Sequence, residues 1–226
     1  MATLSVVATP IGNLEDVTLR ALRVLREADV ILCEDTRVTK KLLDRHEIAD
    51  KMLISYHAQS GLAKEEKIYA LLEEGKHLAL VSDAGTPGIS DPGSLLVSRV
   101  RDRFGDSVKI EPIPGPSAVT AALSAAGVPC SDFLFFGFLP HKKGRETLFR
   151  EIVESKRTSV FYESPHRILK SLEKLAEMLP DSKRVVVARE LTKIHEAFVS
   201  GNAREVFEYF MDQPEKVRGE FVIIVS

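Results

Sequence analysis

The chain has 226 residues, of which 28% are charged and 44% hydrophobic, so it can form one large or two small domains with a substantial core. Its net charge of -2 gives no overall reason to expect a nucleic acid, although a local basic patch is enough to bind one. No apolar run approaches the roughly 20 residues of a membrane span, and the N-terminus lacks a secretory pattern. We therefore expect a cytoplasmic protein with no membrane partner.

The two cysteines, Cys33 and Cys130, lack the spacing of metal ligands, and the sequence predicts no metal site. Both lie beside apolar residues. We therefore expect two buried free thiols rather than a disulfide.

The first half of the chain alternates apolar, strand-like runs with amphipathic helical segments. Strands are predicted at 4–8, 30–33, 52–56, 77–81 and 108–110, and helices at 18–28, 37–46, 63–74 and 94–104. Several of the strands are continuous apolar runs, which is typical of parallel strands in a sheet covered by helices on both faces.

The proline-rich segment 111–116 is the best candidate for a domain boundary, because its prolines make a stiff, extended connection. It predicts two α/β domains, 1–113 and 114–226. The second half shows fewer clear strand–helix–strand units, so we expect a mixed sheet there and a mostly parallel one in the first domain. Its predicted strands are 133–139, 159–162, 185–188 and 221–225, and its helices are 117–126, 145–155, 166–178 and 203–210.

The loop 82–93 follows a predicted buried strand and holds no large side chain other than Ile89. Small residues let backbone approach a ligand closely, and α/β proteins bind ligands just past the carboxyl ends of parallel strands. The loop is neither a dinucleotide fingerprint nor a phosphate-binding loop, so it does not indicate a dinucleotide or a nucleoside triphosphate. Asp83 is placed to accept hydrogen bonds from an amine or a ribose hydroxyl, whereas Asp91 is expected to cap the next helix.

Other segments at strand ends carry polar or charged residues. The turn 9–14 is either a ligand contact or a simple turn, and Ser117 either receives a ligand carboxylate at a helix N-terminus or caps that helix. Charged clusters follow four strands, and we expect them to converge on one edge of the sheet rather than to be separately solvated. They are 33–37, 55–57, 161–167 and 188–193. The basic loop 141–145 is either solvated or a phosphate contact.

Taken together, six segments in chain order resemble the ribosomal RNA small subunit methyltransferase I family, within the tetrapyrrole methylase superfamily. One of them alone is a weak signal, but six in register are specific. They are Thr9-Pro10-Ile11-Gly12-Asn13-Leu14, Glu34-Asp35-Thr36-Arg37, the loop 82–93, Pro114-Gly115-Pro116-Ser117-Ala118, Tyr162-Glu163-Ser164-Pro165-His166-Arg167 and Arg189-Glu190-Leu191-Thr192-Lys193.

The resemblance implies a two-domain tetrapyrrole methylase-like fold, with S-adenosylmethionine bound in the cleft between the domains of a homodimer subunit. It implies methyl transfer to the ribose 2'-oxygen of a cytidine in the decoding region of small-subunit (16S) ribosomal RNA. The implied cofactor contacts are Pro10, Asp83, Gly85, Ile89, Ser117 and Ala118, joined on shorter motifs by Tyr162, Ala188 and Gly219.

Members of this family often continue into a basic C-terminal extension, whereas this sequence stops at Ser226. The resemblance therefore leaves the RNA to be held by other basic residues. The candidates are Lys142, Lys143, Arg145 and Arg37.

Methylation of a ribose hydroxyl needs help, because the hydroxyl is a poor nucleophile with a high pKa. Our hypothesis is that either Glu163 or His57 accepts its proton, or Lys193 or Arg37 stabilises the developing alkoxide. Two other functions remain open from the sequence: methylation of a tetrapyrrole by the same fold, and a cofactor-binding module without catalysis.

Overall fold

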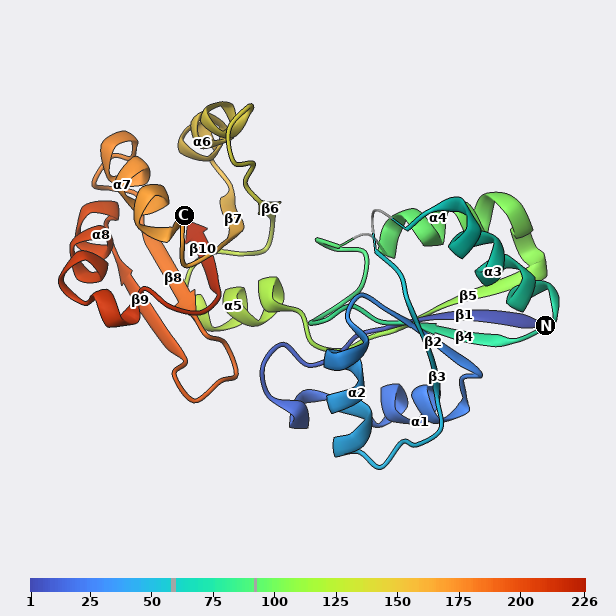
Figure 1. Ribbon diagram of the computed structural model, residues 1–226. Helices are drawn as coiled ribbons and strands as arrows, with labels where there is room; N and C mark the ends of the chain where they lie inside the picture. The colour runs from blue at the N-terminus through green and yellow to red at the C-terminus, as the bar shows by residue number, and fades with distance from the viewer. Residues whose placement is uncertain (58–59, 92) are drawn as a thin grey trace. The chain divides into compact units, whose positions relative to one another are not determined.

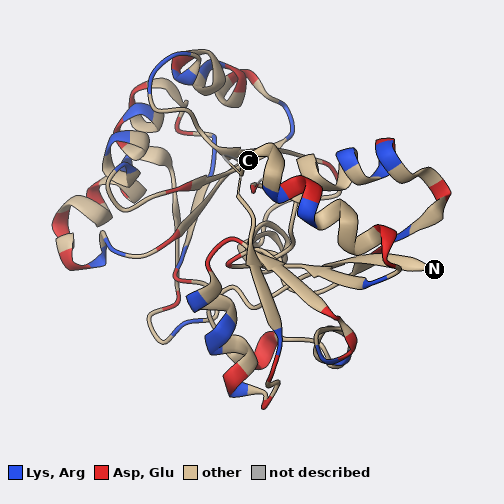
Figure 2. Ribbon diagram, turned by 45° about the vertical axis from the view of Figure 1, so that its right-hand side comes forward, with Lys and Arg blue, Asp and Glu red and all other residues tan. Residues whose placement is uncertain are grey.

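The structure is a computed structural model that describes residues 1–57, 60–91 and 93–226. It divides into two compact units, Met1–Ser117 and Ala118–Ser226, each with its own sheet and helices (Figure 1). Residues 114–117, which the sequence assigned to the second domain, group with the first unit. Charged residues lie mostly on helices and loops, while the strands are largely uncharged (Figure 2).

The first unit contains a five-stranded, wholly parallel sheet, as the apolar runs predicted. Its strand order is β3-β2-β4-β1-β5. The strands are β1 (Ala2–Val7), β2 (Val30–Cys33), β3 (Met52–Ser55), β4 (His77–Leu80) and β5 (Val108–Ile113).

Helices cover both faces of this sheet, because alternate residues of each strand point to opposite sides. Leu78 and Leu80 of β4 pack with the core under α3 and α4, whereas Ala79 packs with the core under α1 and α2 (Figure 1). The helices are α1 (Leu19–Glu27), α2 (Thr36–Arg45), α3 (Leu62–Glu73) and α4 (Gly93–Phe104), with short 3-10 turns at Leu14–Asp16 and Gly105–Ser107.

The neighbouring strands β1 and β4 send the chain to opposite faces, since β1 leads to α1 and β4 leads to α4. This is the switch point of the sheet. In doubly wound sheets, ligands bind beyond the carboxyl ends of the strands at such a point. The topology therefore directs attention to the segments that follow β1 and β4.

The second unit contains a mixed sheet, also as predicted, with strand order β6-β7-β10-β8-β9. β6 and β7 are parallel, and the other neighbours are antiparallel. The strands are β6 (Phe133–Phe138), β7 (Thr158–Glu163), β8 (Val185–Arg189), β9 (Ala197–Gly201) and β10 (Phe221–Val225). The sequence analysis missed β9, an edge strand without a fully buried residue, whose apolar pattern is therefore weak.

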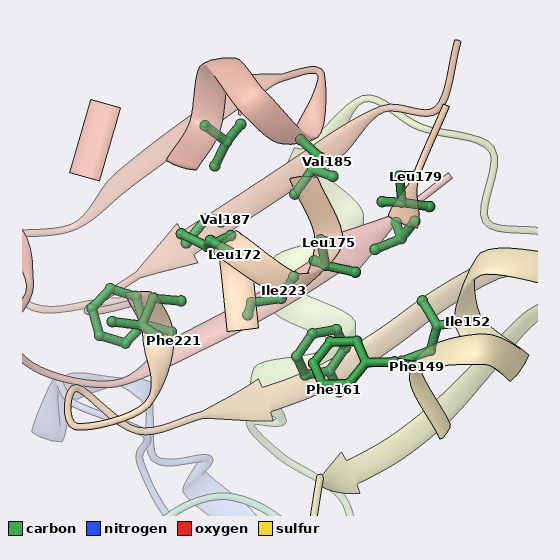
Figure 3. Close-up of a cluster of buried hydrophobic side chains, with 14 of the residues drawn as sticks. Phe149, Ile152, Phe161, Leu172, Leu175, Leu179, Val185, Val187, Phe221 and Ile223 are labelled. Atoms are coloured by element: carbon green, nitrogen blue, oxygen red, sulfur yellow. The ribbon is translucent and has the colours of Figure 1, made fainter. Parts of the chain in front are cut away.

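One face of the second sheet carries the main core of this unit. Figure 3 shows Phe149 and Phe161 packed in this cluster together with Leu175 and Ile223. Helices α6 (Arg145–Glu154), α7 (Ile168–Met178) and α8 (Ala203–Asp212) supply its helical side, while α5 (Ala118–Ala126) contacts β8 and β10; a 3-10 turn spans Pro214–Lys216. Each unit is thus built around cores of its own.

The cysteine expectation is half right. Both thiols are free and Cys33 is buried in the core under α1 and α2, but Cys130 is exposed. Cys130 lies in the connection between α5 and β6, where its apolar sequence neighbours do not place it in a core. Among the residues described, no helix has both the length and the apolar character to span a membrane.

Candidate functional site

The carboxyl edge of the first sheet is a connected surface, because the segments that leave three strands are bonded to one another. Thr9 and Gly85 exchange two backbone hydrogen bonds, with N–O distances of 2.9 and 3.0 Å. The Thr86 hydroxyl donates to the Pro116 carbonyl at 3.0 Å. The exits of β1, β4 and β5 are thereby held in one fixed arrangement.

The loop 82–93 fixes its own shape through Asp91. That carboxylate accepts hydrogen bonds from the backbone N–H groups of Gly88 and Gly93, each at 2.8 Å. Gly93 is the first residue of α4, so the expected capping role of Asp91 is confirmed. Gly85 and Gly88 have φ angles of +80° and +84°, a conformation that side chains disfavour.

The same edge is acidic. The exposed Asp83 accepts a hydrogen bond from the Asp35 backbone N–H at 2.9 Å, which joins the β4 exit to the β2 exit. Burial, followed by the charges of Asp83 and Asp91, raises the pKa of Glu34. Arg37 bonds the Asp35 carboxylate and lowers its pKa to about 2. Negative charge therefore accumulates here, which favours a bound cation and disfavours phosphate.

Most of the expected cofactor residues of the first unit lie at this edge. Pro10 is buried three residues after the end of β1, and Gly85 is buried in the bridge to Thr9, while Ile89 is 51% exposed in the loop after β4. Ser117 ends the segment after β5, and Ala118 begins α5 in the second unit. Sequence reasoning did not foresee that both backbone groups of Gly85 are already paired with Thr9.

A second edge is formed in the second sheet by the carboxyl ends of β6, β7 and β8 and the amino end of β10. Tyr162 and Ala188 both pair in register with Val222, so these three side chains share the face that α5 covers. Burial raises the pKa of Tyr162, and a hydrogen bond with the Val119 backbone partly opposes that effect. Two of the expected cofactor residues, Tyr162 and Ala188, are thus near neighbours across one strand.

Glu163, at the end of β7, is a buried anchor. Its carboxylate pairs with Arg145 at 3.0 Å and with Arg167 at 2.7 Å. It also accepts hydrogen bonds from the Ser171 hydroxyl at 2.6 Å and from the Ser164 backbone at 2.9 Å. The Glu163 side chain is 0% exposed. All of its strong acceptor positions are occupied, which leaves no free oxygen for a substrate proton.

The two arginines extend this anchor to the segment that follows β6. Arg145 donates to the Pro140 carbonyl at 3.3 Å, and Arg167 donates to the Leu139 carbonyl at 2.7 Å. The ends of the basic loop 139–145 are therefore attached to a buried carboxylate. The Arg145 guanidinium is already paired within this network, and its side chain is only 18% exposed. Arg145 is therefore not one of the exposed basic residues that could contact RNA.

Lys193 lies in the turn after β8 and is held by two carboxylates. Its ammonium bonds Glu190 and Glu220, each at 2.8 Å. Burial acts to lower the Lys193 pKa, but the bonds to Glu190 and Glu220 outweigh it, so the pKa is raised. Burial likewise acts to raise the pKa of Glu190, but Lys193 and the Glu220 N–H outweigh it and lower it. Lys193 is therefore a fixed cation rather than a proton acceptor.

The turn around Lys193 is strained. Glu190 and Thr192 have φ angles of 51° and 65°, in the left-handed region that a β-branched residue such as threonine rarely adopts. The Thr192 hydroxyl is buried, with no hydrogen-bond partner among the described residues. Gly219, expected to contact the cofactor, packs against Glu190 with φ of +89°. The sequence placed Thr192 in a charged cluster but did not indicate its left-handed backbone, because nothing in its residue type signals that conformation.

Comparison with known proteins identifies the family of the chain. The family described as Tetrapyrrole (Corrin/Porphyrin) Methylases matches residues 3–206. The chain belongs to this family. Among its relatives, the Ribosomal RNA small subunit methyltransferase I of Thermotoga maritima is 43% identical over 226 residues, covering 100% of this chain and 99% of the relative. The protein of that name from Halalkalibacterium halodurans is 46% identical, covering 99% and 75%.

A solved member shows the same fold. The uroporphyrin-III C-methyl transferase from Thermus thermophilus, complexed with S-adenyl homocysteine, has a TM-score of 0.66 and 17% identity. The match covers 100% of this chain and 96% of that structure. The α/β tetrapyrrole methylase fold, with one parallel and one mixed sheet, is therefore established here.

The residues of the first edge fit a cationic methyl donor. A Cβ on Gly115 would lie 3.0 Å from the Ala8 Cβ, so the β1 and β5 exits approach as closely as only glycine permits. Glu34, Asp35 and Asp83 place their carboxylates at this carboxyl edge of the first sheet. In the part of the chain that the structure describes, no group of three or more His, Cys, Asp or Glu is placed to hold a metal ion.

The expectation that all four charged clusters meet on one edge is wrong, because the strands belong to two sheets. The clusters after β2 and β3, which include Arg37 and His57, lie at the carboxyl edge of the first sheet. The clusters after β7 and β8 lie at the corresponding edge of the second. His57 is exposed, and its backbone N–H bonds the Ser60 hydroxyl at 3.0 Å.

Proposed function

We propose that this tetrapyrrole methylase transfers the methyl group of S-adenosylmethionine to the ribose 2'-oxygen of a cytidine in the decoding region of small-subunit ribosomal RNA. The observation that carries the proposal is the identity, along the whole chain, to curated relatives named Ribosomal RNA small subunit methyltransferase I. The solved tetrapyrrole enzymes match the fold at much lower identity, so they do not favour a tetrapyrrole substrate.

The acidic edge of the first sheet supports a cationic cofactor there. S-adenosylmethionine supplies an electrophilic methyl group carried on a positively charged sulfonium. Asp83 and its neighbour Glu34 supply negative charge, since the Asp35 carboxylate is paired with Arg37, and the bridged segments after β1, β4 and β5 supply a rigid frame that needs little ordering on binding. We propose Pro10, Asp83, Gly85, Ile89 and Ser117 as contacts from this unit, and Ala118, Tyr162, Ala188 and Gly219 from the other.

Burial and ion pairing distinguish the candidate residues that could accept the proton of the ribose hydroxyl or stabilise its alkoxide. We propose His57 as the proton acceptor, because its ring is exposed at the carboxyl edge, whereas the carboxylate of Glu163 is buried and fully engaged. Lys193 is kept as a stabiliser of the alkoxide, because its ammonium is fixed and charged. Arg37 is the other proposed stabiliser; both cations are already paired, Arg37 with Asp35 and Lys193 with Glu190 and Glu220, so pairing alone does not rank them.

The transfer reaction itself tests the main proposal. The protein is incubated with methyl-labelled S-adenosylmethionine and either unmethylated small subunits, the naked ribosomal RNA or a tetrapyrrole precursor. We expect label in the RNA, recovered as 2'-O-methylcytidine after digestion to nucleosides. Label that appears only on the tetrapyrrole overturns the RNA assignment. Calorimetry with S-adenosylmethionine, run in parallel, reports cofactor binding independently of catalysis.

Single-turnover rates test the ranking. His57→Ala should lower the methyl-transfer rate about 10²–10⁴-fold, the usual contribution of a general base, while cofactor affinity stays unchanged. Lys193→Met should also lower the methyl-transfer rate while cofactor affinity stays unchanged. A His57→Ala rate near wild type, with cofactor still bound, excludes His57.

We further propose that the protein acts in the cytoplasm as a homodimer, as the family resemblance implies. Sedimentation equilibrium measures this directly. A mass near twice the 25.1 kDa of the chain is expected, and a monomer at micromolar concentration contradicts it.

A further inference from the structure

The edge strand β6 presents aromatic side chains that the proposed chemistry does not use. Phe133 and Phe138, at its two ends, are 36% and 55% exposed. The Phe138 ring meets Tyr162 edge to face with centroids 5.4 Å apart, and Phe135 meets the same ring at 5.0 Å. Phe138 is therefore held in place by its neighbours while part of its surface faces solvent.

A basic loop follows Phe138 directly. Residues 139–144 contain a histidine and two lysines but no acidic residue, and His141, Lys142 and Lys143 are exposed. Within the described ranges, neither lysine forms an ion pair. Lys142 follows Phe138 by four positions, so their Cα atoms lie within about 14 Å of each other. The loop ends are anchored through Arg145 and Arg167, which limits the entropy lost when the loop binds a partner.

We propose that Phe138 and the loop 139–145 form a platform on which an unpaired base of the substrate RNA stacks, with Lys142 and Lys143 on the adjacent phosphates. This inference rests on the function proposed above and identifies which surface receives the RNA. Aromatic faces beside a basic groove are how proteins hold single-stranded nucleic acid. A polyanion complements the two free lysines, whereas a second copy of the chain pairing along β6 would bring like charges together.

The sequence offers a clean reporter, because it contains no tryptophan. Phe138→Trp introduces a single one, and stacking of a base on the indole quenches its fluorescence. Met211→Trp, at a 52% exposed position on α8, is the matched control. An unstructured RNA oligonucleotide should quench the Phe138→Trp signal and not the control, and duplex RNA should quench neither. Quenching equal in both, or none while the oligonucleotide binds, overturns the proposal.

The affinities of protein variants for the RNA oligonucleotide provide a second test of the platform. Phe138→Ala and Phe138→Leu should weaken oligonucleotide binding about 5–150-fold, and Phe138→Tyr should restore it, because only the π face matters for stacking. Lys142→Ala with Lys143→Ala should lower the slope of log affinity against log salt by about 1.4, whereas Lys156→Ala with Lys170→Ala, at exposed positions, should not.

The outcomes separate this inference from the proposed function. If wild-type protein neither binds S-adenosylmethionine nor methylates RNA, the proposed function fails whatever the fluorescence shows. If Phe138→Ala loses cofactor binding and keeps RNA affinity, the surface belongs to the cofactor and the platform is wrong. If the Phe138→Trp emission changes with protein concentration alone, a second copy covers β6 and the platform is again wrong.

Discussion

At the level of single residues, Glu163 shows how partners decide the role of an ionisable group. Glu163→Gln leaves the largely, but not fully, buried Arg145 and Arg167 without their counter-charge, so the free energy of unfolding should fall by about 3–5 kcal/mol. Glu66→Gln is the control, because Glu66 pairs with Arg103 at the same 3.0 Å but is 61% exposed, and it should cost about 0.2–1 kcal/mol. Urea denaturation measures both, and equal losses contradict the buried-anchor interpretation.

Asp35 has a measurable signature at low pH. Its folded pKa of about 2 lies below the unfolded value of roughly 3.9, so its ionisation stabilises the folded state above about pH 4. That contribution is lost as the pH falls through the folded pKa. Arg37→Ala should return the pKa of Asp35 toward 3.9, whereas Arg45→Ala should leave it near 2. Carbon-detected NMR titration of the Asp35 carboxyl distinguishes these results.

At the level of elements, the turns after β8 and before β10 depend on each other. A Cβ at Gly219 would overlap the Glu190 carboxylate, which holds Lys193. Gly219→Ala should therefore lower the free energy of unfolding by about 1–2 kcal/mol through backbone strain and by about 1–3 kcal/mol more through the overlap. Gly127→Ala, with φ of +64° and open space around the site, should lose the strain alone. Chemical denaturation of both variants checks this, and identical losses would falsify the coupling.

Most elements of the fold were predictable from the sequence. Continuous apolar runs such as Val30–Cys33 and Phe221–Val225 match observed strands, because burial on both faces leaves a strong signal. The edge strand β9 was missed because half-exposed residues carry little pattern. Cys130 was misplaced because apolar neighbours in sequence do not guarantee a core in space.

The candidate site was less predictable than the elements that carry it. Strand exits could be located from the periodicity, so Asp83 and the loop 82–93 were found. What each side chain contacts depends on residues distant in sequence, such as Asp35 for Asp83 and Arg145 for Glu163. Glu163 therefore looked like a candidate base from the sequence, and its buried ion pairs became visible only in three dimensions.

At the level of the whole molecule, each unit has its own buried cores. Residues 1–117 and 118–226, expressed separately, should each unfold cooperatively, with midpoints in the range of about 45–65 °C. A fragment 1–104, which lacks β5 and so exposes β1, is the control and should not. Circular dichroism during heating measures the transitions, and a non-cooperative profile for 118–226 contradicts the independence of that unit.

The anchor at Glu163 also constrains how this protein can evolve. An apolar group of equal volume can replace a buried ion-pair network at little cost, but only when every charged member is exchanged. Each single step away from Glu163, Arg145 or Arg167 passes through a less stable intermediate. Descendant sequences are therefore expected to keep all three residues or to lose all three.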